Sequence, residues 1–150
     1  MCGEDMNHIG PLLARCNQLC KQRMDTDLQK YDVTRAQAHV ILYLLRMEPE
    51  GEVNQKDLEK HFRIKAPTVN GIVERLEEKG MLKRTSGQRD GRCRCLTVTE
   101  KGRQMQQEMD HSIQETEALM VRGFTDEERT RFHALLERII ENMKRGSEDV

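Results

Sequence analysis

The spacing of apolar residues changes once along this chain, and that change limits the fold more than any other feature. Over residues 9–29 and 34–80, and again after residue 99, apolar side chains recur mostly at three- and four-residue steps, which predicts amphipathic helices. Over residues 81–86 and 92–98 the spacing falls to two, around a loop that begins and ends with glycine, which predicts a β-hairpin. The chain is therefore predicted to be mainly α with a small β-hairpin.

The helices before the hairpin have marked ends. Thr34 and Asn54 are suited to N-cap positions, because their side-chain oxygens can accept from the first free backbone N–H groups of a helix. Pro67 suits the first turn of the next helix, where its missing N–H costs nothing, and Gly80 favours the end of that helix. A short capped helix, a tight connection, a second helix and a hairpin, in this order, predict a winged helix-turn-helix.

In such a module the second helix enters the major groove of DNA, so its polar face holds the candidate contacts. Its predicted buried stripe runs from Val69 to Leu76. The polar side and the helix start carry Lys65, Pro67, Thr68, Asn70, Gly71 and Arg75. Thr68 and Asn70 can bond base edges, whereas Arg75 can reach a phosphate. Any solvated helix has a polar face, so this helix alone leaves both interpretations open.

The charge distribution favours DNA binding. The net charge is −1, yet residues 52–102 carry 12 Lys and Arg against 8 Asp and Glu, while the rest of the chain carries 13 against 18. The hairpin holds further candidate contacts, Lys83, Arg84, Arg89, Asp90 and Arg92. A tip arginine can enter a narrow minor groove, and Asp90 can brace it by a paired hydrogen bond. The alternative is a charged tip that only protects a sheet edge, but helix and hairpin together favour DNA.

Composition excludes several classes of protein. A chain of 150 residues predicts a single domain over 1–150. It has no apolar run near the ~20 residues of a membrane span and no signal segment, which predicts a cytoplasmic protein without a membrane partner. Its five cysteines have no zinc-ribbon spacing, which predicts a reduced chain without a metal. No catalytic constellation or phosphate-binding loop is evident, which predicts neither an enzyme nor a cofactor.

The chain resembles the multiple-antibiotic-resistance regulator (MarR) family of bacterial transcription factors. The resemblance rests on residues 55–58 (QKDL), 67–80 (PTVNGIVERLEEKG), 89–92 (RDGR) and 96–102 (LTVTEKG). The Asp-x-Arg wing, followed by a strand and Thr-Glu-Lys-Gly, is the most specific of these features. The likeness extends over essentially the whole chain, because the flanking helices have the lengths and order found in that family.

The resemblance implies a homodimer on a pseudo-palindromic DNA operator. Residues 33–100 would form the winged helix-turn-helix, and residues 8–30 and 101–146 the helical dimerisation part. It also implies that Arg75 contacts the DNA backbone and that Arg92 enters the minor groove. A repressor released by a small effector is the commoner behaviour in this family. The sequence itself favours a dimer, since its terminal amphipathic helices offer more apolar surface than one winged module can cover.

Four residues are candidates for an effector pocket: Cys16, Cys20, His39 and Tyr43. Some relatives sense peroxide through a cysteine on the first helix, but apolar neighbours favour burial of Cys16 and Cys20 as small hydrophobic residues. His39 and Tyr43 share a helix face where relatives keep part of their pocket. Two alternatives stay open: a redox or metal sensor using Cys16 with Cys20 or Cys93 with Cys95, and a helical protein-interaction module.

Overall fold

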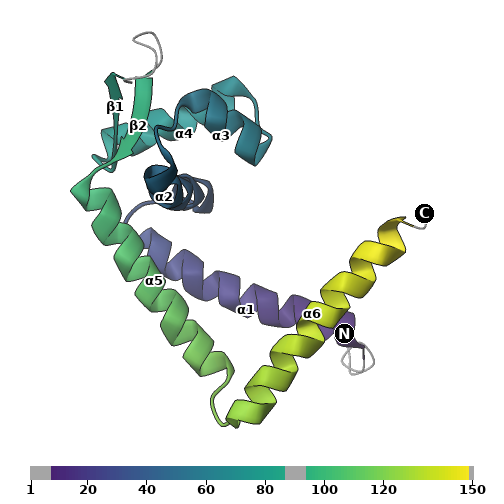
Figure 1. The fold of residues 1–150 in the computed structure, drawn as a ribbon. Helices are drawn as coiled ribbons and strands as arrows, with labels where there is room; N and C mark the ends of the chain where they lie inside the picture. The colour runs from purple at the N-terminus through teal and green to yellow at the C-terminus, as the bar shows by residue number, and fades with distance from the viewer. Residues whose placement is uncertain (1–7, 87–93, 149–150) are drawn as a thin grey trace. The chain divides into compact units, whose positions relative to one another are not determined.

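The computed structural model describes residues 8–86 and 94–148 (Figure 1). Its elements are α1 (Ile9–Gln29), α2 (Arg35–Met47), the 3-10 helix η2 (Glu48–Glu50), α3 (Gln55–Phe62), α4 (Ala66–Glu78), β1 (Leu82–Ser86), β2 (Arg94–Val98), α5 (Glu100–Met120) and α6 (Asp126–Glu148). The predicted fold class, helices with one antiparallel hairpin, is confirmed. The chain divides into two compact units, one ending at Ile113 and the other beginning at Gln114, and each is described by itself.

Local sequence signals set the helix boundaries in the first unit. Thr34 and Asn54 precede α2 and α3 as N-caps, and each forms a capping box with the residue three positions on. Gly80 follows α4 with a φ of +71°, in the left-handed region that suits glycine. Thr99 caps α5 by accepting a hydrogen bond from the N–H of Gly102 at 3.3 Å. These boundaries agree with the sequence predictions to within one or two residues.

The core of the first unit unites the helix-turn-helix with the hairpin. Ile41, Leu58, Val73 and Leu76, from α2, α3 and α4, are fully buried. In Figure 1, α4 lies beside β1 and α2 beside β2, and these pairs of elements are in contact. The N–H of Leu96 also donates to the carbonyl of Val53 at 2.8 Å, which ties β2 to the segment before α3. The stem of the hairpin and α4 therefore belong to one packed body.

The hairpin is also fixed to the start of α5. The strands pair with Leu82 opposite Val98, and Ser86 opposite Arg94. Gly102 lies where the helix meets this pair: a Cβ on it would stand 2.5 Å from the carbonyl oxygen of Met81 and 2.7 Å from Val98 Cγ1. Only a residue without a side chain allows so close an approach.

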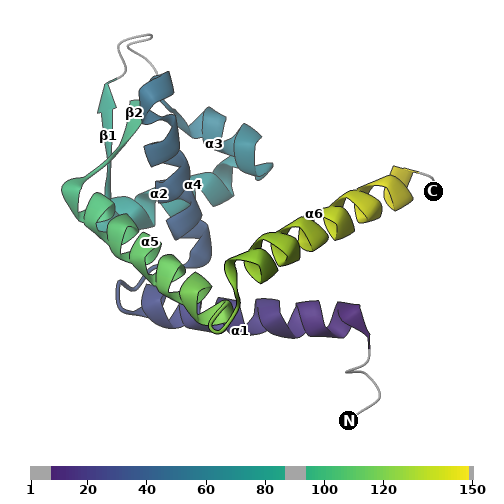
Figure 2. The ribbon, with the colours of Figure 1, turned by 60° about the horizontal axis from the view of Figure 1, so that its bottom comes forward.

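A bidentate ion pair joins α1 to α2, which turns away from the C-terminal end of α1 (Figure 2). Asp25 accepts hydrogen bonds from Nε and Nη2 of Arg35, both at 2.7 Å. The hydrogen bond from Arg35 holds the pKa of Asp25 below its ordinary value of 3.8. Earlier in α1 the prediction of burial is wrong for Cys16, which is exposed, while Cys20 is half-buried. Periodicity identified the apolar face, but nothing in the described chain covers it at Cys16.

The second unit consists of the end of α5, a turn and α6. Gly123 in the turn has a φ of +84°, and the rings of Phe124 and Phe132 meet edge to face, with centroids 6.0 Å apart. No residue of α6 is buried, although its predicted apolar face is present in sequence. None of the helices in the described ranges combines the length and apolar character needed to cross a membrane.

Candidate nucleic-acid interface

The connection between α3 and α4 sets the direction in which α4 leaves the motif. Arg63 ends α3 in the left-handed conformation, with a φ of 54°, a strain that costs a non-glycine residue ~1 kcal/mol. Lys65 then occupies the N-cap position of α4 with extended dihedrals, and Pro67 lies in the first turn. Lys65 makes no side-chain cap bond, but its carbonyl accepts from the N–H groups of Thr68 at 3.0 Å and Val69 at 3.2 Å. Sequence reasoning missed the left-handed Arg63, because no glycine or asparagine marks it.

The exposed face of α4 matches the set of candidate DNA contacts. Val69, Val73 and Leu76 are buried, and this fixes which side of the helix faces the core. On the other side the side chains are exposed or half-buried: Lys65, Pro67, Thr68 and Arg75 are exposed, and Asn70 and Gly71 are half-buried. A Cβ added to Gly71 would meet nothing within 4 Å, so the space beside this backbone is open. A partner surface can therefore approach the main chain of α4 at Gly71.

A polar network links this face to β1. Arg84 Nη2 donates to Asn70 Oδ1 at 3.1 Å. Arg84 Nε lies 3.0 Å from Glu77 Oε1 as an ion pair, without the alignment of a hydrogen bond. Asn70 Oδ1 also accepts from Gln55 Nε2 of α3 at 3.4 Å, and Asn70 Nδ2 donates to Glu74 Oε1 at 2.9 Å. Both ends of the Asn70 amide thus have protein partners, which sequence reasoning did not predict.

The candidates on the hairpin are only partly within the described residues. Lys83 is exposed on β1, and Arg84 is half-buried against α4. Arg89, Asp90 and Arg92, predicted for the wing tip, lie outside the described residues, as does Cys93. The predicted alignment of the tip with the exposed face of α4 therefore stays a prediction.

Of the four candidate effector residues, Tyr43 lines a hollow of the described chain. Cys16 and His39 are exposed. Tyr43 stacks on His61 with ring centroids 4.0 Å apart, and it borders a small hollow of about 210 Å³. That hollow is lined by Tyr43, Met47, Glu50, Gly51, Glu52, Val53 and Asp57. Within the described ranges, no group of three or more His, Cys, Asp or Glu side chains is placed to hold a metal ion.

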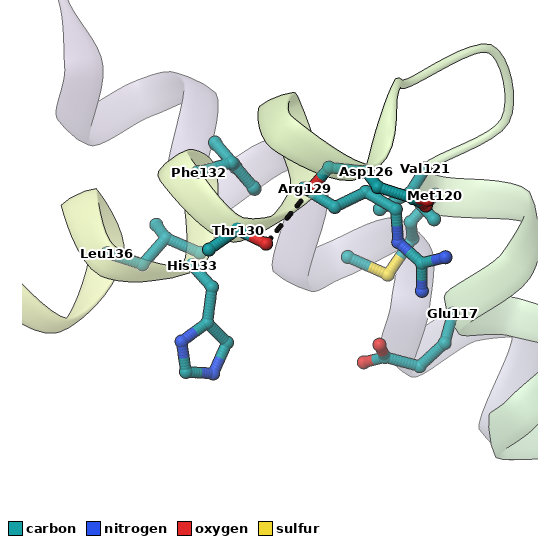
Figure 3. A pocket seen from close by; sticks show the side chains of 9 residues that line it. All are labelled: Glu117, Met120, Val121, Asp126, Arg129, Thr130, Phe132, His133 and Leu136. Carbon is teal, nitrogen blue, oxygen red and sulfur yellow. Dashed lines mark hydrogen bonds between the residues drawn. The ribbon is translucent and has the colours of Figure 1, made fainter.

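A larger hollow lies in the second unit, between the end of α5 and the start of α6 (Figure 3). It measures about 660 Å³ and is lined by Glu117, Met120, Val121, Asp126, Arg129, Thr130, Phe132, His133 and Leu136. Its lining mixes apolar side chains with acidic and basic ones, and Thr130 Oγ1 donates to the carbonyl of Asp126 at 3.0 Å within it. None of these residues was singled out as an effector contact from the sequence.

Comparison with known proteins decides the family. The MarR family model matches residues 31–92. The HTH-type transcriptional regulator YybA of Bacillus subtilis is 27% identical over 128 residues, which cover 83% of this chain and 81% of that protein. The crystal structure of the transcription regulator MarR from Oenococcus oeni is 32% identical, covers 89% of this chain and 99% of that one, and superposes with a TM-score of 0.60. The chain belongs to the MarR family.

Further solved structures share the fold. MepR of S. aureus, solved as a DNA complex, is 25% identical with a TM-score of 0.77, over 89% of this chain and 98% of that one. MepR has also been solved bound to ethidium bromide, with 24% identity, a TM-score of 0.72 and coverage of 91% and 96%. As a MarR-family protein the chain is a DNA-binding transcription regulator with a winged helix-turn-helix. Family membership also confirms the prediction that it is not an enzyme.

Proposed function

We propose that this MarR-family protein is a sequence-specific repressor that binds a pseudo-palindromic DNA operator as a homodimer and is released by a small effector. The observation that carries the DNA-binding part is the exposed face of α4, with open space at Gly71. This face adjoins β1 of a basic hairpin, and both belong to one packed body. A helix can enter the major groove only if such a face is free, because base edges must approach its main chain and side chains closely.

The candidate contacts take different kinds of role in the proposal. Thr68 and Asn70 face base edges, and the absence of a side chain at Gly71 lets the duplex approach. Lys65, Arg75 and Lys83 bind phosphates, which fixes register without reading sequence. Arg89 or Arg92 enters the minor groove with Asp90 as a brace. Residues 33–100 form this DNA-binding part.

Exposed apolar side chains support the proposed dimer. On α1, Ile9 is 65% exposed and Leu19 46%, and on α6, Ile140 is 55% exposed and Met143 69%. Large apolar residues at such exposure, repeated along a helix, are typical of surfaces that a partner covers. A second copy suits both helix faces, since most soluble oligomers are two-fold dimers and a palindromic operator needs two modules. Residues 8–30 and 101–146 form the dimerisation part in this proposal.

An organic effector is proposed because MepR, a relative of the same fold, binds both DNA and ethidium bromide. Cys16, Cys20, His39 and Tyr43 remain candidate contacts for it, and Tyr43 already borders a hollow in the described chain. Binding that favours one spacing of the two winged modules would lower the affinity for an operator of fixed half-site spacing.

The test is the salt dependence of binding to duplexes selected from random DNA. Affinity should fall steeply with salt, with a slope of about −0.9 per phosphate neutralised. Because a dimer has two copies of each contact, Arg75→Ala should reduce the slope by roughly two. Arg122→Ala, which removes an exposed arginine from the turn after α5, is the control and should leave it unchanged. A protein that binds no duplex at low salt, or equal slopes for wild type and Arg75→Ala, would contradict the proposal.

A further inference from the structure

We propose that Arg84 is a specificity-determining residue that restricts Asn70 to donating a hydrogen bond to DNA, rather than a residue that contacts DNA itself. The inference deepens the proposed function and rests on it, because it concerns the base contact assigned to Asn70. It reassigns a residue that its charge and its position on the hairpin had placed among the DNA contacts.

The side chain of Arg84 is committed to α4. It is 20% exposed, its Nη2 donates to Asn70 Oδ1 at 3.1 Å, and its Nε lies 3.0 Å from Glu77 Oε1. Asn70 and Glu77 are seven positions apart on α4, so they lie on the same helix face. One planar guanidinium therefore bridges two turns of this helix from the neighbouring strand. Turning Nε and Nη2 toward a phosphate instead would require Arg84 to give up both partners, and the Glu77 carboxylate would lose this ion pair.

The partners of Asn70 fix which way its amide points. Arginine is only a donor, so the atom facing Arg84 must be the amide oxygen. An ionised carboxylate is only an acceptor, so the atom 2.9 Å from Glu74 Oε1 must be the amide nitrogen. Turning the amide over would bring its N–H groups against Arg84 and its oxygen against Glu74. The network therefore holds one orientation.

This orientation uses up the acceptor of Asn70. The oxygen has two lone pairs, and it accepts from Arg84 and from Gln55 Nε2, the latter at 3.4 Å. The nitrogen has two hydrogens, and the bond to Glu74 uses one of them. What remains for DNA is a single N–H donor.

A single donor discriminates bases differently from a free amide. Bidentate recognition of adenine needs both an acceptor for the N6 amino group and a donor for N7. A donor alone can pair with N7 of either purine, O6 of guanine or O4 of thymine, but beside adenine it leaves the N6 amino group without an acceptor, whereas the guanine and thymine atoms named here are all acceptors. The structure thus assigns to Asn70 a preference for guanine or thymine. Loss of Arg84 would return a lone pair to Asn70 and move the preference toward adenine.

The experiment compares base preferences of full-length wild type, Arg84→Met, Asn70→Ala and Lys83→Met, using duplexes selected from random DNA by each protein. Asn70→Ala should identify the position read by Asn70, where its own preference is lost. At that position Arg84→Met should favour adenine about tenfold more than wild type does, within the range of one bidentate base contact. For Arg84→Met, the slope of affinity against salt should stay at the wild-type value. Lys83→Met, one residue earlier and exposed, should lower that slope and keep the preference.

Three results would overturn the inference: an Arg84→Met protein with the wild-type preference at that position, one with the slope lowered as in Lys83→Met, or an Asn70→Ala protein with wild-type preferences throughout. If Arg84→Met does not fold, Glu77→Gln is judged by the same two measurements, since it weakens the ion pair that holds Arg84 and keeps the shape of the side chain. A wild type that selects no duplex would refute the proposed function itself. If wild type selects duplexes and Arg84→Met shows the same base preferences, only the role of Arg84 is refuted.

Discussion

Two glycine-to-alanine substitutions should change stability in opposite directions, and only one of them should change DNA binding. Gly71 lies inside α4 and Gly102 inside α5, so each gains helix propensity worth ~1 kcal/mol when a methyl group is added. The difference between them is what the added Cβ meets. At Gly71 nothing lies within 4 Å, whereas at Gly102 the Cβ would stand 2.5 Å from the carbonyl oxygen of Met81.

The expected free energies of unfolding follow from these contacts. Gly71→Ala should keep most of the propensity gain and raise the free energy of unfolding by about 0.5–1 kcal/mol. In Gly102→Ala, overpacking against main-chain atoms should cost about 3 kcal/mol, the upper end of the usual range, because backbone yields less readily than side chains. After the propensity gain, the net loss is about 2 kcal/mol, or roughly 4–8 °C in Tm for a chain of this size.

Urea denaturation followed by circular dichroism measures both changes, with all proteins at equal concentration because association would couple stability to concentration. Fluorescence anisotropy with a labelled selected duplex then measures affinity. Gly71→Ala should bind at least about fivefold more weakly, equivalent to ~1 kcal/mol, because its methyl group occupies the space through which the duplex approaches. A Gly102→Ala protein more stable than wild type would refute the packing argument. A stabilised Gly71→Ala protein with unchanged affinity would refute the placement of Gly71 at the DNA.

Three further changes test other parts of the structure. Thr34→Ala removes the capping box of α2 and should lower the free energy of unfolding by ~1 kcal/mol, measured in urea, and an unchanged value would mean that the cap contributes nothing. Asp25→Asn should destabilise the protein at neutral pH but not in strong acid. The pKa of Asp25 is lowered from 3.8 in the folded state, so the ionised carboxylate stabilises the fold fully above about pH 3.8, and this stabilisation is lost as the pH falls through the folded-state pKa. The free energies of unfolding of wild type and variant, measured over a series of pH values, should therefore converge in acid. Leu135→Glu places a charge on the exposed apolar face of α6 and should convert a dimer to monomers in sedimentation equilibrium; a mass equal to that of wild type would exclude this face from the interface.

Local sequence determined the order and limits of the elements. Thr34, Asn54 and Gly80 mark helix ends through interactions with their own neighbouring backbone, and apolar periodicity identifies which face of α4 turns to the core. These signals depend on residues a few positions apart, so they can be recognised without knowing the fold. The exposed candidates on α4 followed from the same periodicity, because a buried stripe leaves the opposite face free.

Tertiary structure decided what those faces and charges meet. Periodicity showed that the Cys16 side of α1 is apolar but not whether anything covers it, and the described chain leaves Cys16 exposed. Charge placed Arg84 among the DNA contacts, yet its guanidinium reaches Asn70, 14 positions earlier in the chain. A basic side chain has the same charge whether its partner is a phosphate or a neighbouring amide. Which of them it meets depends on how β1 packs against α4, and that packing follows from contacts between residues distant in sequence.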